Sequence, residues 1–340
     1  MRYVYNRIKY KIRLILAQIC IHEEDNGLLY KHTDFRDNSS ISARDRKLII
    51  SQIITAANYD YAFYHIFSLD GTYKLEMKLT GMLNTYCLHP SEKAEPYGTN
   101  IAKRVDAQNH QHIFSLRVDP EIDGVENTVI QSDAVASDAP VGSEENPYGN
   151  AFYAKKMTLE TSLQGAANYC HETSRGWDIV NTNKMNQASN KPVGYKILNN
   201  QCPPLMPKPG SVVHKRAGFA TKSLWVLPYR DYELYPAGNY VCQSTGELGH
   251  PHNKTIVDWA NRNESIVNKD IVCYIQFGLT HFPRTEDFPI MPAEPVSVML
   301  RASHFFEKNP ALWVPPSKVV VDKTSRNAFP TEVIKQVPRL

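Results

Sequence analysis

The feature that most constrains the fold of this chain is a repeated alternation of apolar and polar side chains. Between Tyr73 and Leu79, apolar residues at every second position are interleaved with Lys and Glu. Successive side chains of a β-strand point to opposite faces, so a period of two predicts a strand with one wet face. Similar runs occur at 112–118, 222–229, 270–282, 296–302 and 317–322.

Clusters of Pro, Gly and Asn separate these runs, whereas amphipathic helical patterns are scarce. The segment 158–170, "TLETSLQGAANYC", is the one good candidate for a helix, and the polar segment 131–150 predicts a long surface excursion. Many strands and few helices predict a mainly β chain, folded as a large antiparallel β-sandwich with a few short helices.

Composition excludes several classes of protein. The chain has 340 residues, a hydrophobic content of 42% and a net charge of only +3, with acidic and basic residues intermixed. We therefore expect a globular protein with a substantial core and no nucleic-acid partner. No apolar run approaches the roughly 20 residues that cross a bilayer, so no membrane partner is predicted.

Three histidines are candidate metal ligands. His110 and His112 stand two residues apart, so on a strand both imidazoles point to one face. His281 ends an apolar alternation that runs from Cys273, and it is either a hydrogen-bonded core residue or a ligand from a distant part of the chain. Three imidazoles without a thiolate suit copper or zinc equally.

Tyr59 favours copper over zinc. It lies in the run "TAANYDYAF", residues 55–63, between Asn58 and Asp60. A tyrosine beside a redox-active copper could react with dioxygen and become a quinone, whereas zinc has no redox chemistry. The plain alternative is an ordinary strand tyrosine with its hydroxyl hydrogen-bonded.

These motifs resemble those of the copper-containing primary amine oxidases, in which the tyrosine of an Asn-Tyr-Asp/Glu run becomes topaquinone. "NHQHIFSLRVD" (109–119) and "THFPRTEDFPIMP" (280–292) are similar to the copper motifs of that family, and further similar segments follow in family order from about residue 20 to about 329. The nearest resemblance is to the fungal and yeast peroxisomal type.

The resemblance implies a role for each matching residue. Tyr59 would be the topaquinone precursor, where the amine forms a Schiff base, and Asn58 would orient its ring. One copper ion per subunit would be held by three ligands, His110, His112 and His281. Met291 matches a methionine that lies near the copper.

A second cation site is also implied by the resemblance. Asp119 and Asp270 match acidic residues that hold calcium or manganese with hard oxygen donors, and Glu121 occupies a more variable position nearby. The alternative is that both aspartates are solvated acids at strand ends.

The implied activity is oxidative deamination of primary amines by dioxygen, giving an aldehyde, ammonia and hydrogen peroxide. The aspartate that removes the substrate proton in the family has no counterpart expected in this chain. The resemblance therefore predicts a primary-amine oxidase domain, and it leaves open whether this chain is active alone. The alternative functions are a non-catalytic copper-binding relative that acts through dimer or partner contacts, and a zinc hydrolase.

The same resemblance gives expectations for organisation, assembly and location. It divides the chain into an unmatched segment 1–18, a catalytic sandwich truncated at its N-terminal side (19–329) and a tail (330–340). It implies a homodimer, with residues 88–104 where an arm would embrace the partner. The implied location is peroxisomal or cytoplasmic.

Overall fold

A computed structural model describes residues 19–199, 202–238, 254–321 and 332–334. The predicted N-terminal segment 1–18 and nearly all of the predicted tail 330–340 lie outside these ranges. Among the described residues, no helix is long and apolar enough to cross a membrane.

The largest element is a twisted sheet of eleven strands in which every neighbouring pair is antiparallel. Its order is β10-β9-β11-β12-β15-β4-β3-β2-β16-β17, with β1 also paired to β2. The strand bounds are β1 (Cys20–Thr33), β2 (Ser40–Ala56), β3 (Tyr59–Ser68), β4 (Tyr73–Gly81), β9 (Thr128–Ala136), β10 (Phe152–Thr158), β11 (Gly176–Met185), β12 (Pro192–Leu198), β15 (Met291–Ser303), β16 (Lys318–Val321) and β17 (Glu332–Ile334).

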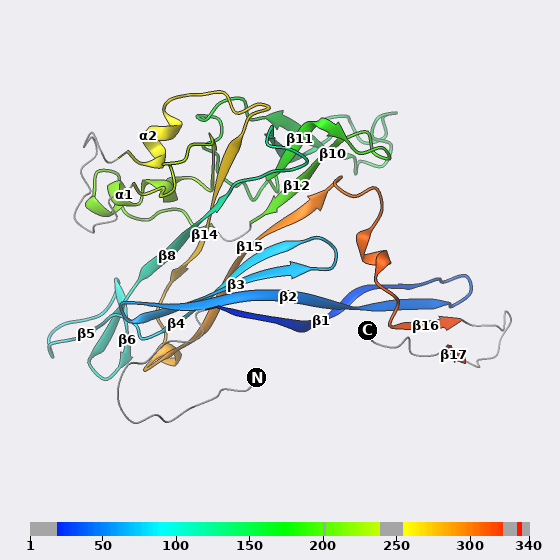
Figure 1. The fold of residues 1–340 in the computed structure, drawn as a ribbon. Helices are drawn as coiled ribbons and strands as arrows, with labels where there is room; N and C mark the ends of the chain where they lie inside the picture. Colours follow the sequence, from blue (N-terminus) through cyan, green and yellow to red (C-terminus); the bar gives the residue numbers. More distant parts are fainter. Residues whose placement is uncertain (1–18, 200–201, 239–253, 322–331, 335–340) are drawn as a thin grey trace.

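Two smaller antiparallel sheets accompany the large one. The first has the order β13-β14-β8 and the second the order β5-β7-β6. In Figure 1, β8 and β14 run diagonally from the upper part of the molecule to the lower left, where β5 and β6 project. Their bounds are β5 (Thr85–Cys87), β6 (Gly98–Ala102), β7 (Val105–Gln108), β8 (His110–Val118), β13 (Leu224–Pro228) and β14 (Ile271–His281).

The described helices are short. Those described are α1 (Val212–Arg216), α2 (Ile256–Ala260) and three 3₁₀ turns, η1 (Gly218–Thr221), η2 (Thr285–Asp287) and η3 (Pro310–Trp313). In Figure 1, α1 and α2 both lie in the upper part of the molecule. The prediction of a mainly β, antiparallel fold with few short helices is confirmed.

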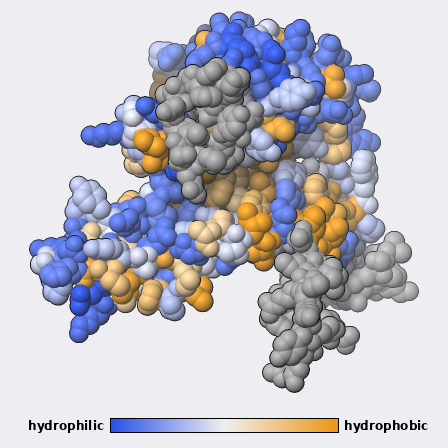
Figure 2. Space-filling view, turned by 60° about the vertical axis from the view of Figure 1, so that its left-hand side comes forward, coloured by the Kyte–Doolittle hydropathy of each residue, from blue (hydrophilic) through white to orange (hydrophobic). Residues whose placement is uncertain are grey.

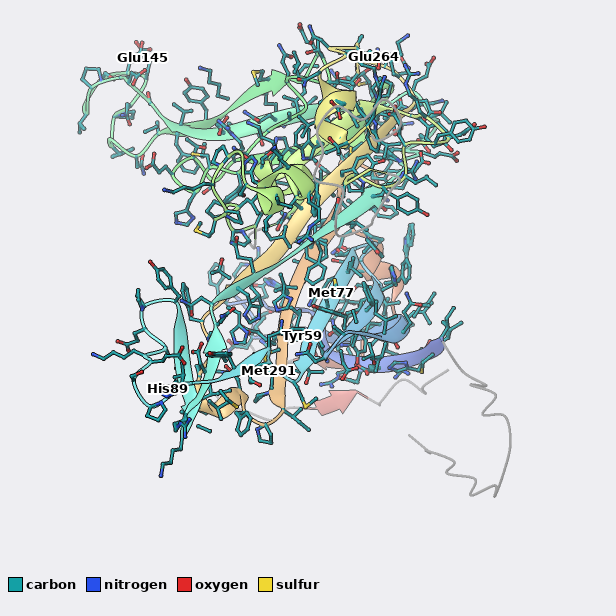
Figure 3. All side chains as sticks on the ribbon, turned by 90° about the vertical axis from the view of Figure 1, so that its left-hand side faces the viewer. Tyr59, Met77, His89, Glu145, Glu264 and Met291 are labelled. Carbon is teal, nitrogen blue, oxygen red and sulfur yellow. The ribbon has the colours of Figure 1, made fainter. Side chains whose placement is uncertain are left out.

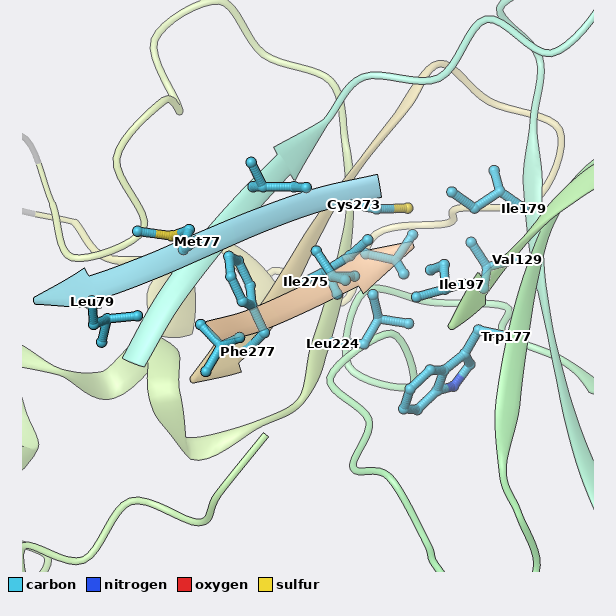
Figure 4. Packing of buried hydrophobic residues seen from close by; sticks show 14 of the residues in the cluster. Met77, Leu79, Val129, Trp177, Ile179, Ile197, Leu224, Cys273, Ile275 and Phe277 are labelled. Carbon is cyan, nitrogen blue, oxygen red and sulfur yellow. The ribbon is translucent and has the colours of Figure 1, made fainter. Parts of the chain in front are cut away.

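The main core lies where the β13-β14-β8 sheet packs against the large sheet. Met77 and Leu79 of β4 are buried in the same cluster as Ile275 and Phe277 of β14 (Figure 4). Each of these side chains is at most 1% exposed. Burying a side chain of this size stabilises the fold by about 1.5–3 kcal/mol. The alternating apolar residues seen in the sequence therefore pack the two sheets against each other.

The predicted helix at 158–170 is wrong. The segment forms turns held by isolated bridges, Thr161 to Ser265 and Ala167 to Leu224. A Cβ at Gly165 would lie 2.7 Å from the carbonyl oxygen of Val226, so this backbone packs directly against β13. Tertiary contact with neighbouring backbone therefore overrides the helical pattern.

The polar excursion predicted at 131–150 begins later than expected. Residues 131–136 belong to β9, and the irregular stretch runs from 137 to 151. Residues 88–104, expected to form an arm, comprise a loop followed by β6 in the small projecting sheet. Whether this sheet contacts a second subunit stays a prediction.

Large apolar side chains also remain on the surface. Ile53 of β2 is 67% exposed and Ile54 is 45% exposed, and Leu48 of the same strand is 41% exposed. Figure 2 shows hydrophobic residues gathered in the waist between the upper and lower parts of the molecule. Apolar surface of this kind is typical of protein contacts or aggregation.

Candidate metal centre

The pairing of β8 with β14 brings the three histidines together. His281 lies directly opposite His110 in the antiparallel register, and Leu279 lies opposite His112. Because side chains two residues apart share a face, His112 lies beside His110 on the inner side of the sheet. One donor atom from each of the three rings lies within 4.8 Å of the others, a spacing that could hold one metal ion.

Each of these imidazoles uses one nitrogen to contact a second residue. His110 Nδ1 is 2.8 Å from the carbonyl oxygen of Gln108, and His281 Nε2 is 3.1 Å from Oδ2 of Asp287. His112 Nδ1 is 3.1 Å from the hydroxyl oxygen of Tyr61. Histidine ligands of metals usually donate their second N–H in this way, which fixes the ring and the nitrogen that faces the metal.

The opposite nitrogens point into a common space. His112 Nε2 and His281 Nδ1 are buried and have no hydrogen-bond partner among the described residues. A buried polar nitrogen without a partner is costly, and a metal ion would satisfy both. Three neutral imidazoles are donors that copper accepts well, so the residues present fit a copper ion.

Burial keeps His110 and His112 neutral. Burial, together with the neighbouring rings of His110 and His281, lowers the pKa of His112 to about 4. The pKa of His110 is also lowered, chiefly by burial, against an opposing hydrogen bond with Gln108. Neutral imidazole is the form that binds a metal, so this pair needs no deprotonation near neutral pH.

Asp287 contacts His281 as a carboxylate anion. Burial by itself would raise the pKa of its carboxyl group, but hydrogen bonds from Arg284 and His281 outweigh burial and lower the pKa. Arg284 donates from its backbone and its guanidinium, at 2.9 and 3.0 Å. The carboxylate therefore accepts the Nε2–H of His281 and leaves Nδ1 for the metal.

Tyr59 lies at the metal-facing side of the cluster. It begins β3, is 7% exposed, and its hydroxyl is 3.2 Å from Nε2 of His110. Its ring is 5.0 Å from the ring of His112, edge-on. Burial raises the pKa of the Tyr59 phenol, although the backbone N–H of Asn84 opposes it.

A tight hairpin turn positions Tyr59. β2 ends at Ala56 and β3 begins at Tyr59, so Ala57 and Asn58 form the turn, Ala57 with a φ of 56°. The Asn58 side chain donates to the carbonyl oxygen of Met82 at 2.6 Å, and its own carbonyl accepts from the Met82 amide at 2.8 Å. The structure thus shows Asn58 fixing the turn, and its role in orienting a quinone stays a prediction.

Met291 begins β15, which is separated from the Tyr59 strand β3 by β4. Gly81 pairs with Tyr59 on one side and with Met291 on the other, and Met291 is 2% exposed. Figure 3 shows Tyr59 and Met291 close together at the same end of the large sheet. The predicted proximity of this methionine to the site therefore agrees with the strand register.

The acidic residues proposed for a second cation lie at the other end of β8 and β14. Eight residues along a strand correspond to roughly 25 Å, and Val118 pairs with Cys273 there. Burial, then the charges of Asp119 and Glu121, raise the pKa of Asp270. Asp119 and Asp270 are exposed, and the three histidines are the one converging cluster of potential ligands among the described residues. The second cation stays a prediction.

Two residues of the site were missed in the sequence. Tyr61 shares a strand face with Tyr59, a signal available from the period of two, and it contacts His112. Asp287 follows His281 by six residues, and no periodicity predicts that the chain turns back through η2 to place it there.

Comparison with known proteins defines the class. Residues 2–321 match the family profile described as copper amine oxidase, enzyme domain. This chain belongs to the copper amine oxidase family. Copper and topaquinone are the cofactors of that family, and the histidine cluster could bind the copper.

Individual relatives give the same result. The chain is 49% identical over 324 residues to the peroxisomal primary amine oxidase of Pichia angusta and 47% identical over 322 residues to copper amine oxidase 1 of Schizosaccharomyces pombe. These matches cover 95% and 94% of this chain but 46% and 45% of the relatives. The chain thus spans about half the length of the curated relatives it matches.

A solved structure agrees in fold. The copper-containing benzylamine oxidase from Hansenula polymorpha superposes with a TM-score of 0.82 at 40% identity, covering 88% of this chain and 46% of that one. The division of the chain into segments 1–18, 19–329 and 330–340 is not tested by these matches and stays a prediction.

Proposed function

We propose that this chain binds one copper ion through His110, His112 and His281 and converts Tyr59 into topaquinone, as the enzyme domain of an oxidase of primary amines. The products would be an aldehyde, ammonia and hydrogen peroxide. The observation that carries the proposal is the hydroxyl of Tyr59, 3.2 Å from the metal-facing nitrogen of His110.

Bound copper would supply redox and Lewis-acid chemistry for oxidation of the Tyr59 ring by dioxygen. The chain's own residues do the positioning. Gln108, Tyr61 and Asp287 hold the imidazoles with one nitrogen of each directed inward. The hairpin turn and Gly81 hold the backbone of Tyr59, since a Cβ at Gly81 would lie 2.9 Å from the Tyr59 Cα.

Copper analysis combined with a redox-cycling quinone stain tests this proposal. After loading with copper under air, we expect about one copper per chain, from a single three-ligand site, and a positive stain that Tyr59→Phe abolishes without removing the metal. A chain that binds copper yet stains no more than Tyr59→Phe contradicts the quinone assignment.

A second candidate is a copper-binding relative that turns over no amine. Among the described residues, no carboxylate is hydrogen-bonded to the hydroxyl of Tyr59, whose side-chain partner is His110. Loss of a positioned base lowers rates about 10²- to 10⁴-fold. Peroxide release from methylamine or benzylamine by the copper-loaded chain excludes this candidate.

We further propose assembly and location from the family. A homodimer agrees with the exposed apolar residues of β2 and with the projecting β5-β7-β6 sheet, and sedimentation of the purified chain tests it. One relative is named a peroxisomal enzyme. A peroxisomal or cytoplasmic location follows by similarity, and imaging of a fluorescent fusion distinguishes the two.

A further inference from the structure

Two tyrosines on one face of β3 contact the histidine cluster in different ways. Tyr59 contacts His110, and Tyr61 contacts His112. The two tyrosines are two residues apart on β3 and the two histidines are two residues apart on β8, so the two contacts lie side by side. The hydroxyl of Tyr59 is 3.2 Å from Nε2 of His110, a ring whose Nδ1 is already bonded to the Gln108 carbonyl. Tyr59 therefore lies on the metal side of its histidine.

Tyr61 lies on the other side of its histidine. Its hydroxyl is 3.1 Å from Nδ1 of His112, while Nε2 of the same ring is buried and has no partner among the described residues. The two rings meet edge-on, with centroids 5.8 Å apart and an interplanar angle of 66°. A second ring, that of Tyr59, packs edge-on against His112 at 5.0 Å, so the imidazole has a fixed plane.

The three second partners of the histidines differ chemically. The Gln108 carbonyl and the Asp287 carboxylate can only accept a hydrogen bond, so each requires N–H on the nitrogen that it contacts. The Tyr61 hydroxyl can accept or donate. Of the three histidines, His112 is thus the one whose second partner can either donate or accept a hydrogen bond, so this partner alone does not fix the tautomer of the ring.

We infer that Tyr61 is a positioning residue for the metal centre: its hydroxyl accepts the Nδ1–H of His112 and leaves Nε2 of that ring as the metal-binding nitrogen. The inference rests on the proposed function, since it assigns a role within the same site. It also distinguishes the two tyrosines. Tyr59 lies where the metal chemistry would occur, and Tyr61 acts only through His112.

Tyr61→Phe removes the hydroxyl and preserves the ring that packs on His112. Tyr64→Phe is the matched control, since Tyr64 is on the same strand but on the opposite face, with Lys78 over its ring at 4.7 Å. Affinity is measured by competition titration with Cu(II) and with Co(II), and the metal's surroundings by the Cu(II) electron paramagnetic resonance spectrum.

For Tyr61→Phe we expect affinity to fall about 10- to 100-fold, the usual effect of losing a partner of a ligating histidine. We also expect altered Cu(II) hyperfine splitting, which a general loss of stability would not produce. Tyr64→Phe should match the wild type in both. Wild-type affinity and an unchanged spectrum in Tyr61→Phe overturn the inference.

A metal-free measurement gives a second test. In the wild-type chain with ¹⁵N-labelled histidine, His112, assigned by loss of its signals in His112→Gln, should carry its ring proton on Nδ1. A proton on Nε2 overturns the inference even where Tyr61→Phe is unstable. A wild-type chain that binds no copper overturns the proposed function, whereas copper binding that Tyr61→Phe leaves unchanged overturns the role of Tyr61 alone.

Discussion

At the scale of residues, the two ring nitrogens of each histidine have different roles in the site. One nitrogen of each ring contacts a carbonyl, a hydroxyl or a carboxylate, and the other faces a shared space. The residue types and the spacing of His110 and His112 were readable in the sequence. Tyr61, which contacts His112, and Asp287, which contacts His281, were not identified, because hydrogen bonds between different strands and turns depend on the fold.

Removing a ligand should remove the metal. His112→Ala deletes a donor whose free nitrogen is buried within the cluster, and we expect copper content to fall from about one per chain to near zero after dialysis, since two imidazoles bind far more weakly than three. His171→Ala, at an exposed position outside the cluster, serves as the control. Equal copper content in both variants by elemental analysis contradicts the ligand assignment.

Asp287 should affect metal affinity without contacting the metal. Asp287→Asn keeps the shape of the side chain but weakens the acceptor for His281 Nε2–H, and we expect about a 10- to 100-fold loss of copper affinity. Glu286→Gln, at the adjacent exposed position, is the matched control. Identical copper titration curves for the two variants would show that Asp287 has no such role.

At the scale of elements, the register of β8 with β14 sets the geometry of the three histidines. A Cβ added at Gly278 would lie 2.0 Å from the carbonyl oxygen of His112 on the facing strand. Gly278 stands opposite Ile113 and three residues before His281, so close backbone approach at this point keeps the two strands in contact.

Gly278→Ala should therefore separate the ligand strands. We expect a loss of at least about 1–3 kcal/mol in the free energy of unfolding, from overpacking, and a weaker metal site. In the control Gly176→Ala, the added Cβ meets the flexible end of Lys196 at 3.1 Å. Denaturant unfolding of both variants measures the effect, and equal stability contradicts the account of strand approach.

The ion pair between Asp133 of β9 and Arg175 should make part of the free energy of unfolding depend on pH. Burial would raise the pKa of the Asp133 carboxyl group, but hydrogen bonds from Arg175 and Thr173 outweigh it and lower the pKa. A lowered pKa in the folded state stabilises the fold above the unfolded value of about 4, and this stabilisation disappears as the pH falls through the folded value.

Asp133→Asn should thus cost about 1–2 kcal/mol at neutral pH, with the difference from wild type closing below about pH 4. Asp138→Asn, at an exposed loop position, is the control. Unfolding curves between pH 3 and 7 provide the measurement, and a difference that stays constant over this range contradicts the assignment.

Strands were more predictable than turns. The alternation at 73–79 predicted β4, which has one face in the core, and the run at 270–282 predicted β14, which is buried on both faces. The segment 158–170 carries a helical pattern but forms turns, since its backbone packs on Val226 and bridges to Leu224. Such contacts come from residues far along the chain and leave no local pattern.

At the scale of the whole molecule, two sheets from different parts of the sequence share one site. Tyr59 comes from the large sheet, and the histidines come from the β13-β14-β8 sheet, so the centre forms only when the two sheets pack. The family's cofactors and this geometry lead to the central claim that this chain can form its own quinone from Tyr59.

The mass of the tryptic peptide that contains both Tyr59 and Tyr61 tests this claim most directly. After copper loading under air, we predict that Tyr59 gains two oxygen atoms and loses two hydrogens, that Tyr61 is unchanged, and that zinc loading or the omission of air leaves both unmodified. A copper-bound chain in which Tyr59 keeps its original mass, or in which Tyr61 is the modified residue, would contradict the account.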